Sequence, residues 1–133
     1  MSDNPAYGFK KTLNASVDEA DARVREELKK EGFGVLTEID VRSTLKEKLG
    51  VDFRPYRILG ACNPPLAHRA LSEEVDIGLL LPCNVVVYAG DEAGTSVVAV
   101  LDPVRQLGLT GRSDLVPLAE DVKARMKRVL DAL

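Results

Sequence analysis

Two valine-rich runs constrain the fold more than any other feature of this sequence. Leu79 to Tyr88 is strongly apolar, is interrupted at Pro82 and ends in three valines at 85–87, and Thr95 to Leu101 is a second β-branched run. A Gly-Asp-Glu-Ala-Gly turn at residues 90–94 separates the two runs. β-branched residues favour strands, and a glycine-containing turn between two such runs is typical of a hairpin. The sequence therefore predicts two antiparallel neighbouring strands.

The rest of the chain alternates between helical and extended patterns. Helices are predicted where apolar residues recur at three- and four-residue steps, and strands where they alternate. Three more strands are expected at Tyr7 to Leu13, Phe33 to Ile39 and Arg54 to Cys62, and four helices at 17–31, 41–49, from Pro64 for about ten residues, and from Ser113 onward. The predicted order is β-α-β-α-β-α-β-β-α.

Polar residues before three of these helices predict where the helices begin. Ser16 and Glu19 form a capping box, and Asp40 caps a short helix that stops at Gly50. Asn63 is expected to cap the third helix, with Pro64 at its first position, where a missing N–H costs nothing.

Composition and charge narrow the class of protein. The chain has 133 residues, of which 45% are hydrophobic and 29% charged, so residues 1–133 are expected to form a single domain with one core. Eighteen basic residues against 21 acidic ones give a net charge of −3 without a basic cluster, so nucleic acid is not an expected partner.

Localisation follows from what the sequence lacks. Residues 1–5 show no export signal and no apolar run is long enough to cross a membrane, so a cytoplasmic protein with no membrane contact is expected. In that compartment Cys62 and Cys83 are predicted to be free thiols.

Several strings of residues resemble the family known as domain of unknown function 302. They are Glu31-Gly32-Phe33-Gly34-Val35, Arg54-Pro55-Tyr56, the stretch from Gly60 to His68, the stretch from Ile77 to Val85, and Asp102-Pro103. The resemblance covers the chain from about Tyr7 to the C-terminus. It implies an α+β fold of the TATA-box-binding-protein-like or helix-grip kind, with helices on a curved antiparallel sheet and a core order β-α-β-β-β-β-α, here with short helical insertions. It also implies a homodimer.

One stretch could carry chemistry, and three interpretations compete for it. His68 is a candidate ligand for haem or a metal, with Cys62 or Cys83 as a second ligand, because histidine and thiolate bind transition metals. Alternatively, Cys62 is the nucleophile of a thiol-dependent enzyme, since the N-terminus of the following helix favours a thiolate. Finally, all three side chains could be purely structural.

The best interpretation is a small-ligand or cofactor-binding module that works as a homodimer. The sequence does not identify the ligand, and it favours a binding protein over an enzyme. Because the valine runs are apolar on both alternating sides, one helical layer cannot cover them, and a second protomer is the simplest cover. We expect Val86 and Val98 to lie on that second face. Alternatively, the chain's own short helices, Asp40 to Leu49 and Pro64 to Leu71, cover it and leave a monomer. A purely structural or interaction domain is a further alternative function.

Overall fold

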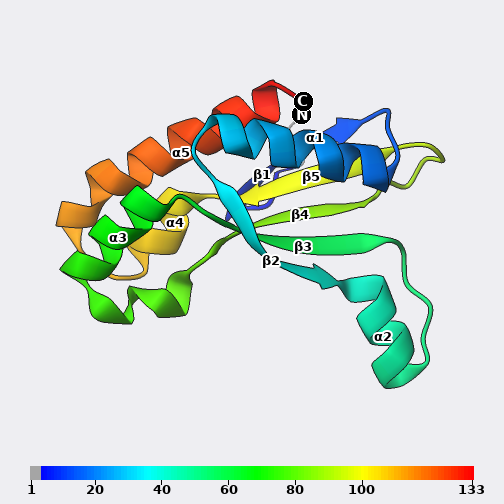
Figure 1. Ribbon diagram of the computed structural model, residues 1–133, viewed down its shortest axis with the longest axis horizontal. Helices are drawn as coiled ribbons and strands as arrows, with labels where there is room; N and C mark the ends of the chain where they lie inside the picture. The colour runs from blue at the N-terminus through cyan, green and yellow to red at the C-terminus, as the bar shows by residue number, and fades with distance from the viewer. Residues whose placement is uncertain (1–3) are drawn as a thin grey trace.

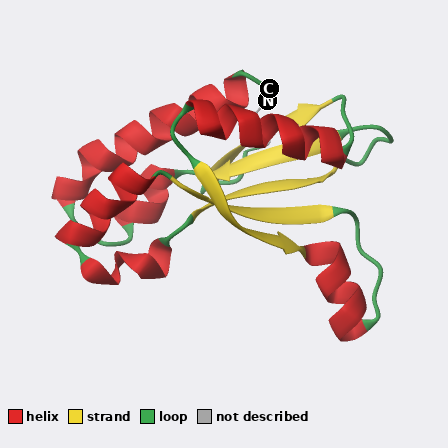
Figure 2. Cartoon of the chain, viewed as in Figure 1, coloured by secondary structure: helices red, strands yellow, loops and turns green. Residues whose placement is uncertain are grey.

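The structure, a computed structural model, describes residues 4–133. Met1 to Asp3, which belong to the segment judged to lack an export signal, lie outside the described residues. The architecture is α+β, with one open antiparallel sheet and helices packed on it (Figures 1 and 2). Its strand order is β1-β5-β4-β3-β2. The strands are β1 (Gly8–Leu13), β2 (Gly34–Asp40), β3 (Tyr56–Cys62), β4 (Cys83–Ala89) and β5 (Ser96–Leu101).

The predicted caps begin the first two helices. Ser16 Oγ accepts a hydrogen bond from the Glu19 N–H at 3.1 Å and starts α1 (Val17–Lys30). Asp40 Oδ1 accepts from the Ser43 N–H at 3.0 Å and starts α2 (Val41–Leu49). That helix ends at Gly50, whose φ of 66° lies in the left-handed region that glycine adopts without strain.

The predicted hairpin is confirmed by the pairing of β4 with β5. Val85 pairs with Val100 and Val87 with Val98, so four valines face the same side. The prediction of a strand from Leu79 was wrong, however. Residues Val75–Leu80 form the 3-10 helix η1, and β4 begins only at Cys83, after Pro82 has interrupted the extended run. Proline lacks the N–H that a central strand needs, which explains why pairing starts after it.

Two further differences concern the last third of the chain. A helix that was not predicted, α4 (Pro103–Gly108), follows β5, and Asp102 Oδ1 caps it by accepting from the Val104 N–H at 2.9 Å. The C-terminal helix α5 (Val116–Asp131) begins after a short 3-10 turn, η2 (Ser113–Leu115), rather than at Ser113. Pro117 lies in its first turn, as proline allows.

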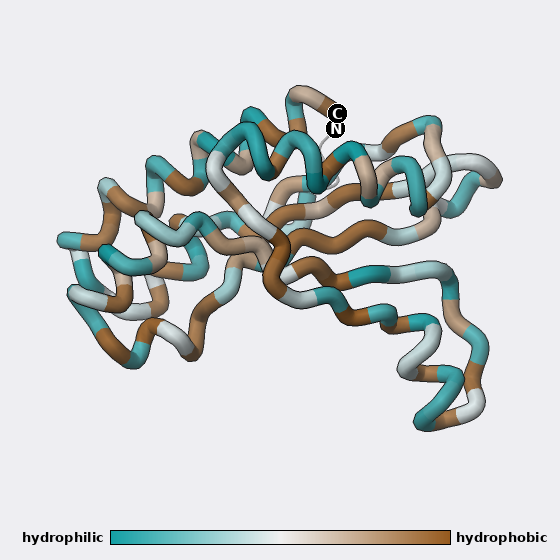
Figure 3. The backbone as a smooth tube through the Cα atoms, in the orientation of Figure 1, coloured by the Kyte–Doolittle hydropathy of each residue, from teal (hydrophilic) through white to brown (hydrophobic). Residues whose placement is uncertain are grey.

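The two faces of the sheet have different surroundings. α1 and α5 pack together along one face, which we call the helix face (Figure 1). Side chains of the central strands are fully buried there, with exposed fractions of 0–2% at Leu59, Ala61, Val85, Val87, Val98 and Val100. Figure 3 shows long hydrophobic stretches along the central strands. Val98 therefore belongs to the core, and its expected place on the second face was wrong.

The opposite, open face carries the residues between those positions. Tyr56 pairs with Tyr88 and Ile58 with Val86 across β3 and β4, and the two tyrosine rings stack with centroids 5.1 Å apart. Neither short helix lies across this face. α2 contacts the ends of β2 and β3 and buries none of its residues, whereas α3 (Pro64–Glu73) packs against η1 and α5.

Among residues 4–133, none of the helices combines the length and apolarity needed to cross a membrane.

Candidate functional site

The junction of β3 and α3 is fixed by Asn63. Its Oδ1 accepts from the Leu66 N–H at 3.4 Å and caps α3, as predicted, while Nδ2 donates to the Glu31 carbonyl at 3.3 Å. The Glu31 carbonyl also accepts from Arg125 Nη1 of α5 at 2.9 Å. These bonds hold the start of α3 against the end of α1 and against α5, so the space between the helices and the sheet end has fixed walls.

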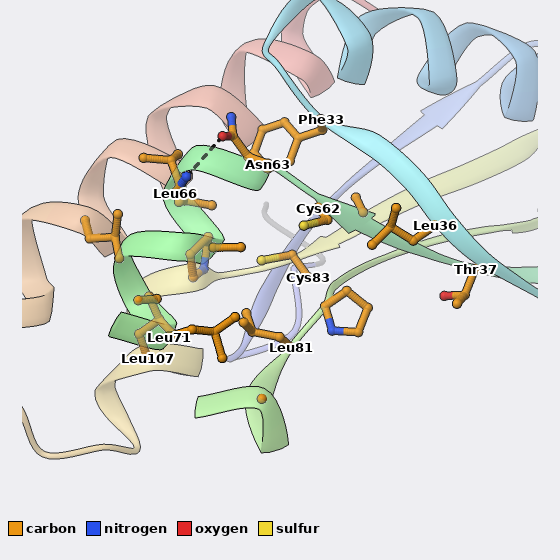
Figure 4. Close-up of a pocket in the computed structure, with 18 residues that line it drawn as sticks. Phe33, Leu36, Thr37, Cys62, Asn63, Leu66, Leu71, Leu81, Cys83 and Leu107 are labelled. Atoms are coloured by element: carbon orange, nitrogen blue, oxygen red, sulfur yellow. Dashed lines mark hydrogen bonds between the residues drawn. The ribbon is translucent and has the colours of Figure 1, made fainter. Parts of the chain in front are cut away.

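A cavity of about 320 Å³ lies in that space (Figure 4). Its walls come from the bulged start of β2, the end of β3, one side of α3, the segment between η1 and β4, and parts of α4 and α5. They consist mainly of aliphatic side chains, including Leu66, Leu81, Leu107, Leu118 and Val122, with Phe33 at the end near α1.

The polar groups of the cavity are few and uncharged. They are the amide of Asn63, the hydroxyl of Thr37 and the thiols of Cys62 and Cys83, and none of the lining residues carries a charged side chain. Both Asn63 side-chain groups already have protein partners. The cavity therefore suits an uncharged, mainly apolar molecule, because a buried charge without a partner is very unfavourable.

Cys83 is held in the wall by a side-chain bridge. Its Sγ donates to Gln106 Oε1 of α4 at 3.4 Å, and Gln106 Nε2 donates to the Leu80 carbonyl at the end of η1. Burial raises the pKa of the Cys83 thiol to about 11, with the Gln106 hydrogen bond acting in the opposite direction. Cys83 is therefore a protonated, anchored thiol at neutral pH.

Cys62 is the second thiol in the cavity. It is the last residue of β3, is half-buried and is not in a disulfide, and Cys83 pairs with its neighbour Ala61 across the strands. In Figure 4 both sulfur atoms lie on the cavity side of the strand ends. The structure thus places the two predicted thiols at one cavity, as free cysteines.

His68 lies apart from them. It is exposed on α3 and is not among the residues that line the cavity, and its carbonyl accepts from Ser72 Oγ at 2.7 Å. Within residues 4–133, no group of three or more His, Cys, Asp or Glu side chains is arranged to hold a metal ion. Arg57, near the site in sequence, instead pairs with Asp18 and Asp21 of α1 on the helix face.

Sequence reasoning missed the cavity's outer wall. A bulge between Val35 and Thr37 shifts the register of β2 against β3, and Leu36 at the bulge lines the cavity while 68% exposed. Thr37 and Pro82 lie over Gly60, where an added Cβ would be 2.8 Å from Pro82 Cγ. A glycine inside a strand often marks such a close approach, so Gly60 was the one usable signal.

Comparison with known proteins identifies the family. The family model described as domain of unknown function DUF302 matches residues 9–133. The crystal structure of an uncharacterized conserved DUF302 protein from Bacillus stearothermophilus is similar, with a TM-score of 0.87 at 36% sequence identity, covering 96% of this chain and 98% of that chain. No curated protein matches the chain. The match over nearly the whole length shows that the chain belongs to the DUF302 family.

Proposed function

We propose that the protein binds a small, uncharged, mainly apolar molecule in the cavity between α3, α5 and the sheet end, and that it works as a homodimer. The observation that carries the proposal is the cavity itself: about 320 Å³, with aliphatic walls and fixed polar groups at a few points. Ligand sites are typically apolar cavities of roughly 300–1,000 Å³ with a few polar groups that orient the ligand. The volume here suits a ligand at the small end of that range.

The walls favour some ligand classes over others. A carboxylate or phosphate ligand would find no cation in the lining, whereas a ketone, ester, ether or aromatic ring would need at most one or two hydrogen-bond donors. Thr37 and the Cys62 thiol are the groups best placed to supply them, because Asn63 and Cys83 already bond within the protein. A haem or metal held by His68 would instead lie on the exposed side of α3, outside this cavity.

A titration with N-phenyl-1-naphthylamine, an uncharged probe whose fluorescence rises in apolar sites, tests the proposal. We expect saturable binding by the wild type and little binding by Ala67→Phe, which fills the cavity from α3. Ala22→Phe, at an exposed position on α1 outside this cavity, is the matched control and should bind like the wild type. The proposed ligand cavity would be contradicted if the wild type shows no saturable binding, or if Ala67→Phe binds the probe as well as the wild type does.

A second titration distinguishes ligand binding in the cavity from cofactor binding at His68. Haemin and divalent metals are titrated into the wild type and His68→Ala, and absorbance is followed. A spectral change that requires His68 would assign a second, surface-bound cofactor site, whereas identical spectra for the two proteins would leave the cavity as the proposed ligand site.

The open face of the sheet supports the proposal of a homodimer. Ile58, Val86, Tyr56 and Tyr88 form an apolar surface at the middle of the sheet that neither short helix covers. A symmetric pair could bury on the order of 1,600 Å² there, the size of a specific interface. Light scattering at micromolar concentration should give about twice the chain mass of 14.4 kDa, and a value near 14.4 kDa would refute the dimer.

A thiol-dependent reaction at Cys62 is a second candidate, because Cys62 is half-buried at the cavity, just before the N-terminus of α3. Burial raises the pKa of Cys83, so its slow labelling serves as the internal control. An enzyme thiol at Cys62 should react with iodoacetamide near neutral pH much faster than Cys83, since the thiolate is the reactive form. Equally slow labelling of both, read by peptide mass spectrometry, would remove the candidate.

A further inference from the structure

The segment from α2 to Phe53 extends away from the sheet as an arm, which we define as residues 41–53 (Figure 1). None of the residues of α2 is buried, and Leu49, Val51 and Phe53 are exposed by 69%, 45% and 43%. Isolated helices shorter than about 12 residues are marginal in water, so a nine-residue helix depends on packing of its apolar side. Phe53 packs near Tyr56, with ring centroids 6.2 Å apart, but α2 itself has little packing within its own chain, which points to a partner.

The arm has a net positive charge. Three cations, Arg42, Lys46 and Lys48, outnumber two anions, Glu47 and Asp52, and all five are exposed. Lys46 Nζ pairs with Asp52 Oδ1 at 3.1 Å, whereas Arg42 and Lys48 make no ion pair within the described part of the chain. Two cations beside an exposed apolar tip are therefore available to a partner that offers carboxylates around an apolar surface.

Such a surface exists at the other end of the sheet, around η1. Val75 and Leu79 are exposed by 80% and 89%, and Leu71 at the end of α3 by 39%. Glu74 and Asp76 lie among them and make no ion pair in residues 4–133, although the nearby Arg112, which pairs with Glu73, also feels the charge of Glu74. The η1 surface, apolar with carboxylates at its rim, is thus complementary to the arm, which is apolar with cations at its rim.

The register places these two surfaces at opposite strand ends. The arm follows Asp40, which pairs with Arg57 at the beginning of β3, whereas η1 leads into β4 at Cys83, which pairs with Ala61 near the end of β3. Two copies that stack their open faces about an axis lying across the strands bring the arm end of each copy over the η1 end of the other. Both contacts then form at once, as a closed twofold pair requires.

The η1 end also borders the cavity. Gly78, Leu71 and Leu36 line the cavity and are exposed, and we call this exposed edge its mouth. We propose that the arm of a second copy of this chain docks on η1 and covers the mouth of the ligand cavity, so that assembly completes the site. This inference rests on the proposed function, because it requires both the homodimer and the ligand cavity.

Exchange of charges between the two surfaces tests the contact. The arm variant is Arg42→Glu with Lys48→Glu, the η1 variant is Glu74→Lys with Asp76→Lys, and a third protein carries all four changes. We expect each double variant to raise the dimer dissociation constant about tenfold or more in about 50 mM salt, through like-charge repulsion, and the combination to restore it. Arg23→Glu with Lys29→Glu on α1 changes the charge equally and should leave the constant near the wild-type value.

Sedimentation equilibrium gives these constants, and far-UV circular dichroism confirms that each variant is folded. A wild type that is monomeric would overturn the inference together with the proposed dimer. The docked arm would be overturned, with the dimer intact, if the double variants do not weaken a wild-type dimer. The same conclusion would follow if the protein with all four changes does not restore the dissociation constant.

Probe binding separates assembly from the cavity. We expect the arm variant to bind N-phenyl-1-naphthylamine at least about threefold more weakly than the wild type at micromolar protein, and to regain wild-type affinity at concentrations that restore its dimer. Equal affinity in monomer and dimer would show that the arm does not cover the mouth, although the cavity would still bind the probe.

Discussion

The two faces of the sheet are built from alternate residues of the same strands, yet one is closed within the chain and the other is not. On the helix face, Val87 and Val98 are fully buried beneath α1 and α5, whereas on the open face Val86 and Tyr88 are only partly covered. The two faces differ in residue type. The helix face carries four valines of β4 and β5, whereas Ile58 and Val86 lie beside Tyr56 and Tyr88 on the open face. Both sets are apolar enough to be buried, so the helices that pack on the sheet decide which side becomes the core.

A carboxylate on the helix face should give the largest effect. Val98→Asp places a charge where the side chain is 0% exposed, and Lys11, opposite it on β1, already donates to the Leu130 and Leu133 carbonyls. We expect a loss of more than about 4 kcal/mol in the free energy of unfolding. The protein should be unfolded or aggregated by circular dichroism. A folded, soluble Val98→Asp protein would mean that this face is not the core.

Truncation of neighbours in β3 sharpens the contrast between the faces. Leu59→Ala removes a side chain that is 0% exposed, and we expect a loss of roughly 3 kcal/mol. Ile58→Ala, on the open face, should cost about 1 kcal/mol or less in the monomer. Urea denaturation at low protein concentration measures both, and similar losses would contradict the assignment of the faces.

The pH dependence of stability should report the buried thiol of Cys83. Its pKa is about 11 in the folded protein, raised from 9.0 by burial. The protonated form is favoured by folding, so this contribution is complete below pH 9 and is lost as the pH rises towards 11, by on the order of 2–3 kcal/mol. For Cys83→Ala, the free energy of unfolding should fall less between pH 9 and 11 than for the wild type. Parallel plots of this free energy against pH for the two proteins would refute the prediction.

A carboxylate on the open face should have the smallest effect on unfolding. Val86→Asp is expected to change the free energy of unfolding of the monomer by about 1 kcal/mol or less, because the side chain is only half-buried. Assembly should nevertheless be lost, which light scattering would show as a mass near 14.4 kDa. A Val86→Asp protein that still dimerises would place the interface elsewhere.

Much of the fold could be predicted because its signals are local. The caps at Ser16, Asp40 and Asn63 and the stop at Gly50 each act within a few residues, and all are found where the sequence indicates. The helix α4 was missed although Asp102 and Pro103 repeat the cap-and-proline pattern of Asn63 and Pro64. The same local pattern therefore indicates α4 as well.

The errors arise where long-range contacts decide the outcome. Leu79 and Leu80 favour a strand by composition, but the Gln106 amide binds the Leu80 carbonyl from α4, and the segment is helical up to that point. Likewise, the alternation in β5 cannot tell which of Val97 and Val98 faces α1. Only the pairing of Val98 with Val87 under that helix settles it.

The candidate site divides in the same way. Cys62 and Cys83 were both predicted as candidate site residues. Both line the cavity, because the end of β3 pairs with the start of β4. The aliphatic wall came from α4, α5 and the bulge at Leu36, which no local pattern connects. His68 was predicted as a ligand from its chemistry and its place near Cys62 in the sequence, but α3 presents it outside the cavity.

The position of β1 has a consequence for synthesis of the chain. Within residues 4–133, β1 pairs only with β5, so Gly8 waits for Leu101, about 90 residues later, whereas β2, β3 and β4 find partners among nearer segments. At translation rates of roughly 5–20 residues per second, the leading strand emerges about 5–20 s before its partner. A ribosome-bound chain thus carries an unpaired strand edge for that interval, when it is most exposed to mispairing with a neighbouring nascent chain.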